Sequence, residues 1–111
     1  MEVIVVTTLD QPTTLSVIVP AYRSSSVGEA VASVASLRPE RVVVVDSSPD
    51  EPLSLDGVVR RLWSPDRMNP AEARNRGAES LRSDFLLFLD SDVVLTEEAC
   101  RFIGEFLGFP D

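Results

Sequence analysis

The sequence predicts an α/β fold in which helices cover both faces of a mostly parallel sheet, a three-layer arrangement. Three apolar, β-branched or aromatic runs carry this prediction: Leu15 to Pro20, Arg41 to Asp46 and Asp84 to Leu89. Each run is almost continuously apolar instead of alternating with polar residues, which is typical of parallel strands covered on both faces. Helical patterns lie between the runs, and strands that alternate with helices favour a parallel sheet.

Capping residues mark the start of each predicted helix. Ser26 precedes the first, Asn69 caps the second with Pro70 as its first helical residue, and Thr96 caps the third. The first helix, which Pro39 ends, has its apolar residues at helical spacing: Val27, Ala30, Val31, Val34 and Leu37.

Other segments are less regular. Val58 to Trp63 is expected to form a short strand, and Met1 to Thr8 is either an edge strand or disordered. The second helix is expected to extend to Arg82, although Gly77 within it weakens the helical pattern.

Length and composition indicate a single soluble domain over residues 1–111. Hydrophobic residues make up 44% of the 111-residue chain, an ordinary value for a soluble protein. No apolar run approaches the ~20 residues that cross a bilayer. Residues 1–9 lack the basic start of a signal peptide, and one cysteine, Cys100, forms no internal disulfide. We therefore expect a cytoplasmic protein without a membrane segment.

The charged residues narrow the chemistry. The chain has 18 acidic and 10 basic residues, a formal charge of −8, which argues against nucleic acid or an anionic membrane as partner. Every basic residue is Arg, and with no His and no Lys there is no Ser-His relay, imidazole zinc ligand, Walker loop or Schiff base. Carboxylates remain, and they suit hard cations such as Mg²⁺ or Mn²⁺.

Polar residues follow the three main predicted strands at their carboxyl ends. The segments are "PAY" at Pro20, Ala21 and Tyr22, "DSS" from Asp46, and "DSD" from Asp90 to Asp92. Ligands of open parallel sheets bind at this edge. We therefore expect the three segments to lie together around one ligand.

Asp90 and Asp92 would repel each other at short range unless a divalent cation lay between them, and such a cation also holds phosphates. The alternative is that Asp90 caps a turn and Asp92 faces water. The strand carries the pair to the expected ligand edge, so we favour a metal site.

Other candidates are open to two interpretations. Asp46 either bonds the following backbone as a turn residue or accepts hydrogen bonds from a nucleobase. The Tyr22 side chain either packs against the rest of the protein or flanks a nucleobase. Arg74 lies near the start of a helix, where anions bind, whereas Arg76 and Arg82 are expected to face solvent.

The segments "LSVIVPAYR", "VVVVDSS" and "NPAEARNRGAESLRSDFLLFLDSDVVL" resemble, in order and spacing, the nucleotide-sugar-binding half of family 2 glycosyltransferases. The resemblance covers Leu15 to about Leu107. It implies a Rossmann-like GT-A fold, a nucleotide-diphosphate sugar as partner, and inverting transfer to an unknown acceptor.

The resemblance also implies roles for individual residues. It assigns these nucleotide-binding residues: Pro20, Ala21, Tyr22, Asp46, Ser47, Arg74, Asn75 and Asp90. It assigns Asp90 and Asp92 to a divalent cation, Mn²⁺ or Mg²⁺. The departures are Arg23 where the family has Asn, Ser47 where many members have a second Asp, and Asn69 and Pro70 in a stretch that is commonly Gly-rich.

The chain is expected to be incomplete at its carboxyl end, because the family's catalytic base and acceptor region lie downstream of D-x-D. The acidic residues after that motif are Glu97, Glu98, Glu105 and Asp111, and the first three fall in a predicted helix. The catalytic base is therefore unknown. Exposed apolar surface would then favour self-association or a second polypeptide that completes the enzyme.

Two alternatives remain. "LLFLDSDVV" also matches the D-x-D-x-[TV] motif of haloacid dehalogenase-type phosphatases, with Asp90 as nucleophile and Asp92 as acid. That motif normally opens its domain and needs a downstream Lys, which this chain lacks. The other alternative is a non-catalytic nucleotide-binding module or a fragment of a split transferase.

Overall fold

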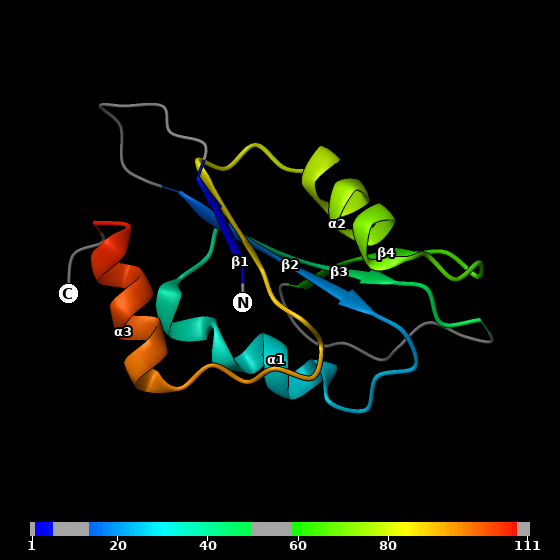
Figure 1. Cartoon of the computed structure of the whole chain (residues 1–111), viewed down its shortest axis with the longest axis horizontal. Helices are drawn as coiled ribbons and strands as arrows, with labels where there is room; N and C mark the ends of the chain where they lie inside the picture. Colours follow the sequence, from blue (N-terminus) through cyan, green and yellow to red (C-terminus); the bar gives the residue numbers. More distant parts are fainter. Residues whose placement is uncertain (1, 6–13, 50–58, 109–111) are drawn as a thin grey trace.

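The structure, a computed structural model, describes residues 2–5, 14–49 and 59–108. Within them, one sheet has the strand order β1-β5-β2-β3-β4 (Figure 1). The strands are β1 (Glu2–Val5), β2 (Leu15–Ala21), β3 (Arg41–Asp46), β4 (Val59–Trp63) and β5 (Phe85–Phe88). The strands β5, β2, β3 and β4 are parallel, and β1 pairs antiparallel with β5 at the edge. The predicted α/β class with a mostly parallel sheet is confirmed.

Helices cover both faces of the sheet (Figure 1). One face carries α1 (Val27–Ser33), the 3₁₀ helix η1 (Ala35–Leu37) and α3 (Glu97–Phe106). The other carries α2 (Pro70–Glu79). The three layers follow from strands that are apolar on both sides, since each face must be buried against a helix.

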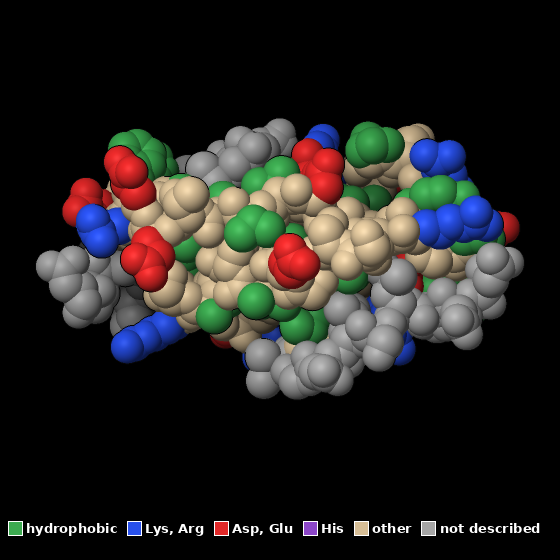
Figure 2. All heavy atoms as spheres, turned by 90° about the horizontal axis from the view of Figure 1, so that it is seen from below, with side chains coloured by type: hydrophobic (Ala, Val, Ile, Leu, Met, Phe, Trp, Pro, Cys, Tyr) green, Lys and Arg blue, Asp and Glu red, His purple; other side chains and the backbone are tan. Residues whose placement is uncertain are grey.

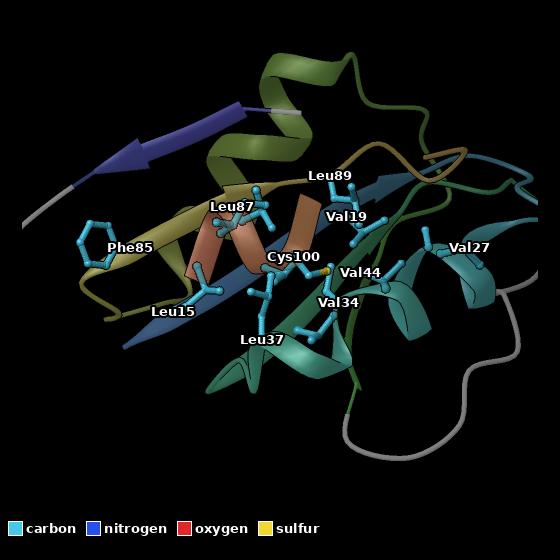
Figure 3. Close-up of a cluster of buried hydrophobic side chains, with 14 of the residues drawn as sticks. Leu15, Val19, Val27, Val34, Leu37, Val44, Phe85, Leu87, Leu89 and Cys100 are labelled. Carbon is cyan, nitrogen blue, oxygen red and sulfur yellow. The ribbon is translucent and has the colours of Figure 1, made fainter. Parts of the chain in front are cut away.

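Alternate residues of each strand supply two separate cores. Leu15, Val17 and Val19 of β2 face α1 and α3, where Cys100 is also buried (Figure 3). Ile18 of the same strand faces α2 instead. Successive strand side chains point to opposite faces, so an unbroken apolar run is what a strand between two helical layers requires.

Two predicted helices end earlier than expected. The first ends as α-helix at Ser33 and continues as η1, after which Arg38 adopts the left-handed conformation with φ 49°. The second ends at Glu79, not at Arg82. The prediction of one helix through Leu37 missed this change, because apolar spacing alone does not separate α from 3₁₀ turns.

Gly77 brings α2 close to the sheet. A Cβ at this position would lie 2.6 Å from Cγ2 of Ile18 and 3.2 Å from Cγ2 of Val45. Glycine weakens a helical pattern, but here its lack of a Cβ allows α2 to pack closely on β2 and β3. Helix α2 runs through Gly77 without interruption.

Among the described residues, the exposed large apolar side chains are Tyr22, Trp63, Val94, Phe102 and Phe106. Phe102 and Phe106 are exposed on the outer side of α3. Among residues 2–5, 14–49 and 59–108, no helix combines the length and apolar character that a membrane crossing needs.

Candidate functional site

A cleft of about 1020 Å³ opens where β2, β3 and β5 end, beside the first turn of α2. Tyr22, Ser47, Asp90 and Asp92 line it, together with Asn69 at the start of the helix. The sequence placed the first four of these at three separate strand ends. The structure confirms that they share one cavity, of the size that small-molecule ligands occupy.

The ends of β2 and β3 form a closely hydrogen-bonded part of the site. Ala21 pairs with Asp46 across the two strands, and the Ser47 amide donates to the Ala21 carbonyl at 3.0 Å. The amide of Arg23 donates to Oγ of Ser48 at 2.9 Å. Arg23 itself has a φ of 48°, a left-handed conformation that Asn adopts more easily than Arg.

Asp46 lies beneath this part of the cleft and does not line it. Its side chain is completely buried, and its Oδ1 accepts a hydrogen bond from the Ser48 amide at 2.9 Å. That contact is the turn interaction that the sequence left as one of two interpretations. Ser47, the next residue, is the one that reaches the cleft from β3.

Asp90 and Asp92 are exposed on the turn that follows β5. The amide of Leu89 still bonds to β2, donating to the Ile18 carbonyl at 2.9 Å. Beyond it the chain turns, with the Val93 amide donating to the Asp90 carbonyl at 3.0 Å. These backbone hydrogen bonds fix the turn that carries both carboxylates, and both line the same cleft.

Arg74 reaches Asp90 from the second turn of α2. Its Nη2 lies 3.8 Å from Oδ1 of Asp90, and both side chains are partly exposed. Within the described part of the chain, Nε of Arg74 is buried without a hydrogen-bond partner. Arg74 and Asn75 were both predicted to contact the nucleotide, but neither lines the cleft: Arg74 meets it through Asp90, and Asn75 is exposed on α2. Arg76 and Arg82 are exposed, as expected.

The cap of α2 forms part of the cleft wall. Oδ1 of Asn69 accepts from the Glu72 amide at 2.9 Å, while its Nδ2 donates to Oε1 of Glu72 at 2.6 Å. The predicted cap, with Pro70 as first helical residue, is confirmed. The reciprocal contact satisfies donors at the helix start and fixes its orientation to the cleft.

Sequence reasoning missed several cleft residues, among them Arg67 and Ser26. The guanidinium carbon of Arg67 lies 4.3 Å from the centre of the Tyr22 ring. Oγ of Ser26 donates to the Ser91 carbonyl at 2.8 Å and so ties the start of α1 to the aspartate turn. Both contacts join segments that are distant in the chain. The sequence offered one signal for each residue, namely a polar side chain in a segment near the expected ligand edge.

Asp90 and Asp92 offer a divalent cation two carboxylates. Among the described residues, no group of three or more His, Cys, Asp or Glu side chains is placed to hold a metal. Mg²⁺ in phosphate sites commonly takes one or two carboxylates and completes its shell with phosphate oxygens and water. The residues present therefore fit a cation that arrives with a phosphate ligand.

Fold and site together define an open-sheet α/β domain with a ligand cleft at the carboxyl ends of its strands. The chain belongs to glycosyl transferase family 2, whose family model matches residues 16–107. The match takes in all three strand ends, so the resemblance seen in the motifs is confirmed. The family match therefore excludes the alternative interpretation as a haloacid dehalogenase-type phosphatase.

Two relatives extend the comparison. The chain is 42% identical over 66 residues to the pre-mycofactocin glycosyltransferase of two strains of Mycobacterium tuberculosis. Each alignment covers 54% of this chain and 14% of the relative. The chain thus corresponds to a small part of these longer proteins.

Proposed function

We propose that this domain binds a nucleotide-diphosphate sugar, through a divalent cation at Asp90 and Asp92, as the donor half of an inverting glycosyltransferase. The observation that carries the proposal is the shared cleft, in which both carboxylates lie with Tyr22 and Ser47. Membership of glycosyl transferase family 2 supports glycosyl transfer as the reaction.

Different groups of described residues would contact different parts of the ligand. Tyr22 and Ser47, at the ends of β2 and β3, flank the nucleoside, and Asp46 supports that wall from beneath. Arg74 faces the diphosphate together with Asp90. The bound cation would neutralise the charge that develops on the leaving diphosphate.

Transfer needs a base next to the acceptor hydroxyl. The cleft carboxylate besides Asp90 and Asp92 is Glu72, whose side chain is engaged by Asn69 in the cap of α2. The chain has no His, and Asp90 and Asp92 are assigned to the cation. Glu97, Glu98 and Glu105 lie on α3 and do not line the cleft. We therefore infer that this chain alone binds donor and transfers no sugar.

Titration calorimetry with uridine and guanosine diphosphates tests the metal-supported binding. With Mn²⁺ or Mg²⁺ present, the diphosphate should bind more tightly than with chelator, since Asp90 and Asp92 otherwise repel it. Asp92→Asn should remove most of the difference. Glu97→Gln, an exposed carboxylate outside the cleft, is the matched control. Equal affinities with and without metal would contradict the proposal.

A transfer assay tests the inference about the base. A panel of nucleotide sugars should yield no transferred sugar with this chain, although the diphosphates bind. Robust turnover would show that a base is present, and Glu97 and Asp111 would be the first residues to replace.

A further inference from the structure

Arg67 lies in the segment between β4 and α2, at residues 64–69, and lines the cleft. Its guanidinium carbon sits 4.3 Å from the centre of the Tyr22 ring, well within the ~6 Å range of a cation–π contact. Arg23 approaches the same ring at 5.5 Å. The Tyr22 ring therefore positions the positively charged guanidinium of Arg67 in the cleft.

Arg67 has no anionic partner among the residues that the structure describes. Arg74 lies 3.8 Å from Asp90, but none of the carboxylates described lies within ion-pair distance of Arg67. A guanidinium has five N–H donors and no acceptor. In a chain with a formal charge of −8, an exposed Arg held against an aromatic ring in the cleft is placed to meet a ligand.

The position of Arg67 indicates which part of the ligand it would contact. Sheet order places β5 on one side of β2 and β3 on the other. Asp90 and Asp92 follow β5, on the side that the proposed function assigns to the diphosphate, and Arg74 contacts Asp90. Arg67 comes from the segment after β4, on the β3 side, and contacts the ring that follows β2. It therefore lies at the nucleoside end of the cleft.

We propose that Arg67 is a nucleobase-binding residue and that Tyr22 is the platform that positions it, an inference that rests on the proposed function. The guanidinium can offer its free face to the base and its N–H edge to base carbonyl oxygens, as Arg commonly does. Holding Arg67 on the ring before the ligand arrives lowers the entropy lost on binding. Tyr22 then contributes through Arg67 as well as through its own contact with the base.

A double-mutant cycle, measured by titration calorimetry with Mn²⁺, tests this inference. Arg67→Ala should weaken binding of the better of uridine and guanosine diphosphates by about tenfold, the size of a partly desolvated cation–π or stacking contact. Binding of inorganic pyrophosphate should not change. Tyr22→Ala should cause a loss at least as large, and the double variant should lose little more than Tyr22→Ala alone. Tyr22→Phe keeps the ring and should keep most of the affinity.

Arg60→Ala is the matched control, because Arg60 is also exposed but lies on β4 outside the cleft. Equal losses for pyrophosphate and the nucleoside diphosphate would show a phosphate contact and overturn the base assignment. Unchanged nucleoside diphosphate binding in Arg67→Ala would overturn the inference and leave the proposed function standing. If the unaltered chain bound pyrophosphate but no nucleoside diphosphate, both would fall.

Discussion

Asp46 and Asp90 occupy equivalent places in the sequence and opposite environments in the structure. Each follows an apolar run and precedes a serine, in "VVVVDSS" and "LLFLDSD". Asp46 is completely buried and accepts a hydrogen bond from the Ser48 amide. The Asp90 side chain is 61% exposed and lines the cleft beside Arg74.

The difference comes from where hydrogen bonding between strands stops. Asp46 is the last residue of β3 and pairs with Ala21 on one side and Trp63 on the other. Its carbonyl also accepts from the Ser64 amide at 2.9 Å. Strand β5 ends at Phe88, so Asp90 lies beyond its last pair. A carboxylate inside the ladder is used by the backbone, while one beyond it is available to a ligand.

The largest expected effect separates the two aspartates by stability. Asp46→Ala should lower the free energy of unfolding by about 1–3 kcal/mol, because it leaves a buried Ser48 amide without its acceptor. Asp90→Ala should change it by less than about 0.5 kcal/mol, as is usual for surface positions. Urea denaturation followed by circular dichroism measures both.

Asp46→Asn is the matched control for that comparison, since the amide keeps an oxygen for Ser48 and should retain most of the stability. Equal losses of stability for Asp46→Ala and Asp90→Ala would mean that the turn after β3 does not depend on its carboxylate.

The next effect concerns ligand binding at the exposed aspartate. Arg74→Ala should weaken binding of a nucleoside diphosphate by about 1–3 kcal/mol, the size of a charge-assisted hydrogen bond. Arg82→Ala removes the same charge from an exposed position outside the cleft and should have little effect. Calorimetry with Mn²⁺ measures both, and comparable losses would place Arg74 away from the ligand.

The smallest effect concerns the hold on the aspartate turn. Ser26→Ala removes the hydrogen bond to the Ser91 carbonyl and should reduce metal-supported binding by about 0.5–1.5 kcal/mol. Ser26 makes no side-chain cap to α1, so the helix should persist. Ser36→Ala, at an exposed residue of η1, is the control. A loss for diphosphate in chelator as large as that in Mn²⁺ would show that Ser26 acts on general stability and not on the metal pair.

Much of the site was visible in local sequence patterns. Asn69 and Thr96 were recognised as caps because their side chains bond amides three residues ahead, a short-range interaction that needs no tertiary context. The gathering of Tyr22, Ser47, Asp90 and Asp92 followed from parallel strands, which all end at one edge. Arg67 and Ser26 were missed because their partners, Tyr22 and Ser91, lie far away in the chain.

The space-filling view illustrates a second limit of the sequence. On the face that carries α1 and α3, acidic side chains are scattered, whereas basic ones stand mainly toward the two ends of the molecule (Figure 2). A net charge of −8 describes the whole chain and says nothing of this distribution. Arg23 and Arg67 line the cleft, and Arg74 contacts the cleft residue Asp90, because the fold brings these distant segments together.

The sequence by itself determined the α/β class, the main strands, the helix starts and the edge at which polar residues collect. These depend on apolar runs, caps and chain order, which are local properties. Tertiary structure alone decided which strand residues face which core, that Asp46 is buried while Asp90 is exposed, and that Arg67 meets Tyr22. The physical reason is that apolar runs look the same on both faces of a strand. Burial, pairing and cation–π contact arise only when distant segments pack together.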